Sequence, residues 1–124
     1  MSLTSRITGI GLLFLLMILS GVWLARTGKP YSPVLFNVHK ILSLAAVVLA
    51  GIQAYFLFRQ AHSRSLEMIL LILAGVLFIV LLITGGLLNE DLEFYHLVRT
   101  VHRITPVLAV ALTAVVFYLL LRKG

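Results

Sequence analysis

Four long apolar runs, separated by short polar connections, dominate this chain of 124 residues and limit it to very few folds. The runs cover residues 7–25, 34–58, 68–88 and 97–121. Each is long enough to cross the hydrocarbon core of a bilayer, which takes about 20 residues of helix. Because a backbone in lipid must satisfy its own hydrogen bonds, each run is predicted to be a transmembrane helix.

The connections cover residues 26–33, 59–67 and 89–96, so consecutive helices are expected to be antiparallel neighbours. The predicted fold is all-α, an integral membrane up-down four-helix bundle that forms a single domain over residues 1–124. A hydrophobic fraction of 61% and a charged fraction of 11% leave no room for a soluble catalytic domain. The chain has no cysteine, which excludes thiol chemistry and Cys-ligated metal clusters.

The even-numbered runs repeat each other. Residues 38–41 read VHKI and residues 101–104 read VHRI, and both runs end in Tyr-x-x-x-Arg. At an offset of 63 residues, nine positions of the 22-residue window from Val38 are identical to the window from Val101. An apolar composition raises chance matches of Ala, Val and Leu, but it does not explain a shared His, Tyr and Arg.

The odd-numbered runs also correspond, at an offset of 64, because MILSG at residues 17–21 aligns with LLITG at residues 81–85. The chain is therefore predicted to contain two copies of a helical hairpin, approximately residues 7–59 and residues 68–122. An even number of spans in each copy keeps both copies in the same orientation. Such parallel repeats are related by a pseudo-two-fold axis along the membrane normal.

His39 and His102 occupy the same place in the two copies, near the starts of the second and fourth helices. Both are expected at one depth on diagonal helices, an arrangement that bundles use for cofactor sites. Ionisable residues inside membranes tend to be paired and functional. Zinc wants about four ligands, and no acidic residue lies within the four runs. Haem iron needs only two axial protein ligands, so a single haem fits this pair better.

Cations and small residues surround the two histidines in the sequence. Lys40 and Arg103 follow them directly, and Arg99 lies one turn before His102. These three side chains are expected to pair with haem propionates.

Ser20-Gly21 and Thr84-Gly85 are predicted on the same side of the membrane as the histidines. Small residues there allow the backbone to approach a flat ring. Their hydroxyls are expected to bond either a propionate or the second nitrogen of a ligating imidazole, which fixes its tautomer.

In these features the chain resembles the small prokaryotic membrane b-type cytochromes of the cytochrome b561-like and ferric-reductase-like four-helix group. The resemblance implies that His39 and His102 are the axial ligands of a haem b, in a bacterial or archaeal cell membrane. Many members hold two haems, but the remaining His62 and His96 lie at connections on opposite sides of the membrane. One haem near one face is therefore expected, exchanging single electrons with a quinone, a partner protein or an oxidant at that face.

Two other functions stay open, a small four-helix transporter or channel and a non-catalytic membrane anchor subunit. A transporter is disfavoured because the interiors of the runs lack charged residues and Gln53 is the only strongly polar residue near a mid-span. Tyr31 and Tyr95 are candidates for lining a quinone or electron-exit site. No residue is predicted to be catalytic, and the oligomeric state is left open.

The Lys and Arg residues lie near the ends of the runs, which indicates contacts with lipid headgroups and not with nucleic acid. Five fall on each side of the predicted membrane, so their count alone does not orient the chain. Glu90, Asp91 and Glu93 share one side, whereas Glu67 lies on the other. This distribution favours termini in the cytoplasm.

Overall fold

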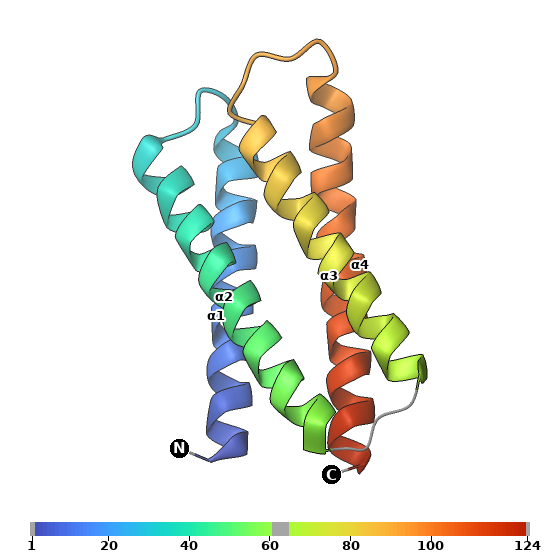
Figure 1. Cartoon of the computed structure of the whole chain (residues 1–124). Helices are drawn as coiled ribbons and strands as arrows, with labels where there is room; N and C mark the ends of the chain where they lie inside the picture. Colours follow the sequence, from blue (N-terminus) through green and yellow to red (C-terminus); the bar gives the residue numbers. More distant parts are fainter. Residues whose placement is uncertain (1, 61–64, 124) are drawn as a thin grey trace. The chain divides into compact units, whose positions relative to one another are not determined.

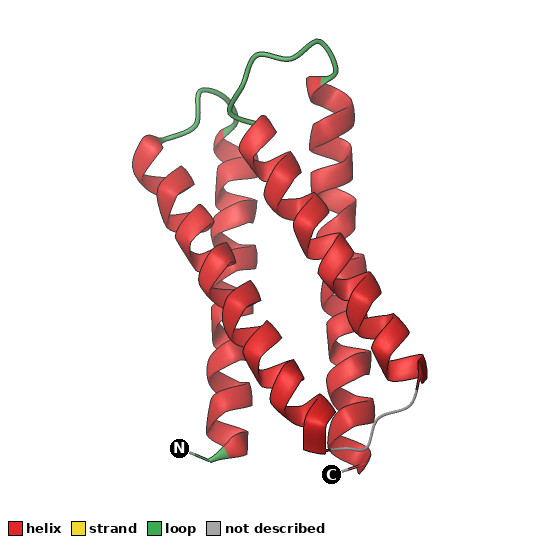
Figure 2. Cartoon of the chain, viewed as in Figure 1, coloured by secondary structure: helices red, strands yellow, loops and turns green. Residues whose placement is uncertain are grey.

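A computed structural model describes residues 2–60 and 65–123, and there the chain is helical outside its connections (Figures 1 and 2). The four helices are α1 (Leu3–Thr27), α2 (Pro33–Gln60), α3 (Ser65–Leu87) and α4 (Tyr95–Lys123). All are long and apolar enough to cross a membrane. Even α3, with 23 residues, reaches about 34 Å, against a hydrocarbon core of about 30 Å. The prediction of an all-α four-helix bundle is confirmed.

The chain divides into two compact units, Met1–Gln53 and Ala54–Gly124. The first unit holds α1 and the greater part of α2. The second holds the last turns of α2 together with α3 and α4. Each unit contains one of the two predicted histidines, so the surroundings of each histidine are described within its own unit.

Local chemistry sets the ends of α1. The Ser2 side chain accepts a hydrogen bond from Ser5 N at 3.1 Å and caps the first turn. Gly28 ends the helix with φ of +69°, a conformation that costs glycine little, and its N–H donates to Leu24 O at 3.0 Å.

The start of α2 is similarly encoded. Pro33 is its first residue, where the missing N–H of proline removes no helical hydrogen bond. Ser32 Oγ accepts from Leu35 N at 3.4 Å. A capping serine before a proline therefore defines where the second helix begins.

One face of α1 is buried, with side chains spaced by three or four residues as expected for a helix that packs along one stripe. This stripe consists of Ile10, Phe14, Met17, Ser20 and Leu24. The buried positions of α2 include Ala46 and Ala50, whose small side chains allow close helix packing.

The second unit has a core where α2 ends. Leu57, Val116 and Leu120 are buried there, and partly buried apolar side chains pack against them: Phe58, Leu70, Leu71 and Phe117. Glu67 was predicted in the polar connection before α3, and this prediction is wrong. It lies in the first turn of α3 with only 3% of its surface exposed. Its carboxylate is placed where the positive end of the helix favours a negative charge.

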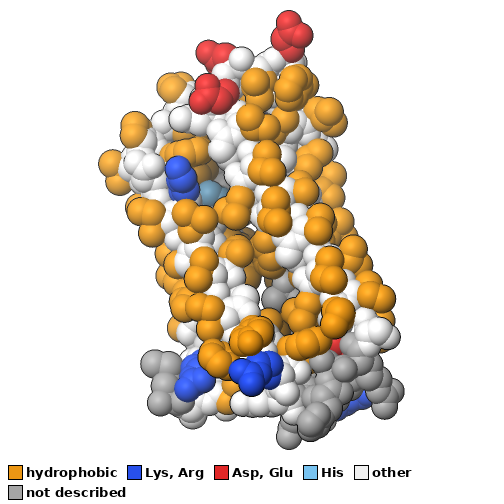
Figure 3. Space-filling model, viewed as in Figure 1, with side chains coloured by type: hydrophobic (Ala, Val, Ile, Leu, Met, Phe, Trp, Pro, Cys, Tyr) orange, Lys and Arg blue, Asp and Glu red, His pale blue; other side chains and the backbone are white. Residues whose placement is uncertain are grey.

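The outward faces of the helices carry many exposed Leu, Ile, Val and Phe side chains. The space-filling view shows this apolar covering and the acidic side chains gathered near the connection between α3 and α4 (Figure 3). In water such a surface would be unfavourable, whereas in lipid it is the expected exterior. These helices indicate an integral membrane protein.

Candidate functional site

His39 is held by the small-residue pair of α1. Ser20 Oγ lies 2.8 Å from His39 Nδ1. The next residue, Gly21, presents bare backbone to the ring, because a Cβ at this position would lie 2.9 Å from His39 Cε1. We call Ser20, Gly21 and His39 the first clamp. The hydroxyl holds the edge of the imidazole, and the glycine permits the close approach.

The second unit contains the same arrangement. Thr84 Oγ1 lies 2.8 Å from His102 Nδ1. A Cβ built on Gly85 would lie 3.1 Å from His102 Cε1. Thr84, Gly85 and His102 form the second clamp. The sequence had predicted the small-residue pairs near the histidines, and the structure brings each pair into contact with its own histidine.

The hydroxyl protons determine which ring nitrogen carries hydrogen. Ser20 Oγ also lies 2.9 Å from Met17 O, and Thr84 Oγ1 lies 2.8 Å from Val80 O and 3.2 Å from Leu81 O. A carbonyl can only accept, and a hydroxyl has one proton to donate. These contacts are hydrogen bonds only if each hydroxyl donates to a backbone carbonyl oxygen and accepts from Nδ1–H, with the one proton of Thr84 shared between the carbonyls of Val80 and Leu81. Each imidazole then has its proton on Nδ1 and its lone pair on Nε2.

Both histidines lie at nearly the same depth in their helices. His39 is six residues beyond Pro33, and His102 is seven residues beyond Tyr95. At a rise of 1.5 Å per residue, they lie roughly 9 and 10 Å from the starts of α2 and α4. Each ring is therefore within the membrane-spanning part of its helix but near one end of it.

The duplication extends to residues that the sequence analysis missed. Phe14 and Phe78 correspond at the offset of 64, and both are buried. Ala46 and Ala109 correspond at the offset of 63 and are fully buried, two turns after each histidine on the same helical face. The offsets of 63 and 64 that relate the two copies could have identified these pairs from the sequence. In an apolar run, however, a matching pair of phenylalanines or alanines does not stand out from chance matches of other apolar residues.

Three cations predicted near the site have no ion pair within the described part of the chain: Lys40, Arg99 and Arg103. Lys40 and Arg103 are exposed, and Arg99 is half-buried. Their expected pairing with propionates stays a prediction. Cations beside the clamps leave positive charge available for an anionic group at this depth.

The remaining histidines do not join the clamps. His96 is exposed in the first turn of α4, where its ring lies edge-on to Tyr95 with centroids 5.7 Å apart. His62 lies outside the described residues. Among the residues described, no three His, Asp or Glu side chains are grouped to hold a metal ion. A metal site built from protein ligands alone therefore finds no support there.

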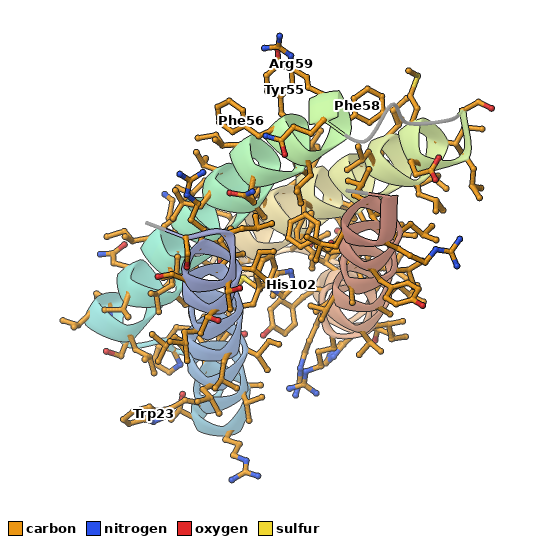
Figure 4. The ribbon with its side chains drawn as sticks, turned by 90° about the horizontal axis from the view of Figure 1, so that it is seen from below. Trp23, Tyr55, Phe56, Phe58, Arg59 and His102 are labelled. Atoms are coloured by element: carbon orange, nitrogen blue, oxygen red, sulfur yellow. The ribbon has the colours of Figure 1, made fainter. Side chains whose placement is uncertain are left out.

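Aromatic side chains mark the periphery of the units. Trp23 on α1 is 63% exposed, and Tyr31 stacks on Phe36 at 6.3 Å. Tyr55 and Arg59 extend together from the end of α2, with Arg59 Cζ 5.9 Å from the ring centre (Figure 4). Such amphipathic side chains are typical of the membrane interface.

Fold and site together define an all-α protein whose four helices are long and apolar enough to span a membrane, with one histidine clamp in each of its two units. No protein-family model, curated protein or solved structure matches the chain.

Proposed function

We propose that the chain is a membrane b-type cytochrome that binds one haem b through His39 Nε2 and His102 Nε2. The observation that supports this most directly is the duplicated clamp. In each clamp a hydroxyl meets Nδ1 of the ring, and Nε2 would be the nitrogen that binds iron. Metal-ligating histidines in proteins are oriented in this way by a hydrogen bond to the other ring nitrogen.

The donor set fits haem iron. Two neutral imidazoles supply two axial ligands, and a porphyrin supplies the other four nitrogens. The half-buried Arg99, with Lys40 and Arg103, would balance the negative charge of the propionates. When bound, haem supplies one-electron chemistry.

The chain's own residues would orient the iron ligands, exclude water and neutralise charge. Ser20 and Thr84 keep the imidazole protons on Nδ1. The buried Phe14 and Phe78 keep the surroundings apolar. Because both histidines lie near the starts of their helices, electrons would be exchanged at that face, with a quinone or a partner protein as acceptor or donor.

The test is the visible spectrum of the protein expressed with haem supplied. We expect a red protein with a Soret band and sharp bands after reduction. His39→Ala and His102→Ala should each abolish the low-spin spectrum. The matched control is His96→Ala, which removes an exposed histidine from the same helix as His102 and should leave the spectrum unchanged. A low-spin spectrum that survives in the double alanine variant would overturn the proposal, as would a colourless wild-type protein that does not take up added haem.

A further inference from the structure

The helices α2 and α4 end in the same pair of side chains, a tyrosine followed one turn later by an arginine. In α2 the pair is Tyr55 and Arg59, and in α4 it is Tyr118 and Arg122. All four side chains are exposed, with exposed fractions of 57% for Tyr55 and 63% for Tyr118. Both pairs belong to the second unit, which therefore carries this motif twice.

The apolar core of the second unit determines the direction in which the two pairs face. Leu57 of α2 shares a buried cluster with Val116 and Leu120 of α4. Each tyrosine lies two residues before a member of this cluster, Tyr55 before Leu57 and Tyr118 before Leu120. Two residues correspond to about 200° around a helix of 3.6 residues per turn. Both tyrosines, and the arginines one turn further along the same helical face, therefore point away from the core and toward the surrounding lipid.

The position of each arginine along its helix corresponds to the lipid headgroups. Arg59 is 26 residues beyond the start of α2, and Arg122 is 27 residues beyond the start of α4. At a rise of 1.5 Å per residue, the arginines lie about 39 and 40 Å along their helices. The hydrocarbon core is about 30 Å thick, and the bilayer with its headgroups about 40–45 Å. In α2 the guanidinium is also held over the neighbouring ring, because Arg59 Cζ lies 5.9 Å from the centre of the Tyr55 ring.

The exposed charge at this end of the second unit is positive. Three of the four acidic side chains of the chain lie in residues 90–93, just before α4 begins and thus at its opposite end (Figure 3). The fourth, Glu67, has only 3% of its surface exposed. Within the described part of the chain, neither Arg59 nor Arg122 forms an ion pair with a carboxylate. Both guanidinium groups therefore attract an anion from outside the chain.

We infer that each tyrosine–arginine pair binds the headgroup of one anionic phospholipid, so that the second unit carries two such lipid sites. The lipid phosphate accepts hydrogen bonds from the guanidinium, and the tyrosine packs against the lipid at the interface. A zwitterionic lipid offers the same phosphate together with a cation, so its net attraction to an arginine is weaker. The two sites lie at the other ends of α2 and α4 from the histidines, and they do not depend on haem.

Native mass spectrometry of the full chain in detergent, titrated with phosphatidylglycerol or phosphatidylcholine of the same acyl chains, tests the two sites. We expect the wild type to bind two phosphatidylglycerol molecules more tightly than phosphatidylcholine. An arginine near the surface contributes a factor of about five to the binding of anionic lipid. Arg59→Gln and Arg122→Gln should each weaken one of the two binding steps by about fivefold, and the double variant should lose the preference. Tyr55→Leu removes the ring that holds Arg59 and should weaken one step by about two- to fivefold.

Arg26→Gln is the matched control, because Arg26 is also an exposed arginine in the last turn of a helix but does not follow a tyrosine by one turn. It should leave the preference for phosphatidylglycerol unchanged. Equal binding of the two lipids by the wild type would overturn the inference. An effect of Arg26→Gln as large as that of Arg59→Gln would also overturn it, because total charge would then explain the binding.

Inorganic phosphate separates a lipid site from a simple anion site. It lacks acyl chains that can lie along the exposed apolar faces of the helices, so an excess of inorganic phosphate should not displace bound phosphatidylglycerol. Displacement would show that the arginines bind free anions and would overturn the assignment to lipid. Because the substituted side chains are exposed, every variant should keep the helical circular dichroism of the wild type.

Discussion

Replacing Gly21 with alanine is the most direct perturbation of the first clamp. The added Cβ would lie 2.9 Å from His39 Cε1, a separation that Cβ atoms in proteins essentially never show. Carbon atoms pack best at about 3.5–4.0 Å, so the imidazole must move by roughly 0.6–1.1 Å. Nδ1 now lies 2.8 Å from Ser20 Oγ, and a displacement of this size lengthens the hydrogen bond beyond its useful range.

The expected cost follows from these displacements. Loss of the hydrogen bond costs about 1 kcal/mol, and overpacking costs about 1–3 kcal/mol. The better helix propensity of alanine offsets up to about 1 kcal/mol of this loss in the free energy of unfolding. Gly21→Ala should therefore lower the free energy of unfolding by roughly 1–3 kcal/mol and, under the proposed function, weaken the binding of haem.

Gly11→Ala is the matched control, because it lies in the same helix and its added Cβ would meet no atom of the described chain within 4 Å. It should leave stability unchanged or raise it slightly. Denaturant unfolding in detergent, followed by helical circular dichroism, measures both variants. The ¹⁵N resonances of His39 report the Nδ1 hydrogen bond. If both variants unfold at the same denaturant concentration and the His39 resonances stay as in wild type, the close packing of glycine on the imidazole is not what holds the ring.

Other expected outcomes concern the tautomer, the core and the buried carboxylate. Ser20→Ala and Thr84→Ala each remove the acceptor of an Nδ1–H, so ¹⁵N spectra of the haem-free protein should show the other tautomer gaining population; unchanged spectra would contradict the assignment. Leu120→Ala empties part of a fully buried position and should cost about 2–4 kcal/mol in denaturant unfolding, whereas Leu108→Ala, at an exposed position of the same helix, should cost far less. Glu67→Gln keeps the shape of the side chain but removes its charge at the start of α3, so unfolding measured at neutral pH should be easier by about 0.5–1 kcal/mol; equal stability would show that the charge contributes nothing there.

Much of the architecture could be predicted from the sequence, because the length of an apolar run depends only on the order of residues along the chain. Four runs of bilayer length determined four helices. The boundaries shifted by a few residues where caps decide them, as at Ser32 before Pro33. Glu67 was placed wrongly for a related reason, since a run defined by hydropathy starts at the first apolar residue and excludes the polar first turn of α3.

The histidine pair was equally accessible, because an internal repeat makes a rare residue stand out against an apolar background. His39 with His102, and Ser20-Gly21 with Thr84-Gly85, were all identified from two offsets. The same offsets align Phe14 with Phe78, but a buried phenylalanine in an apolar run carries little information until its burial is known.

What the fold alone decided is the hydrogen bonding of the rings. Ser20 and His39 are 19 residues apart on different helices, and their contact depends on the rotation of each helix about its axis and on the depth at which the two helices pack. Neither the rotation of a helix nor its packing depth can be predicted from a hydropathy pattern. The proton position on each imidazole follows from the second contact of the hydroxyl with Met17 O or Val80 O, which exists only once that packing is known. Hydropathy thus determined the four helices, and three-dimensional packing determined which hydroxyl each imidazole contacts.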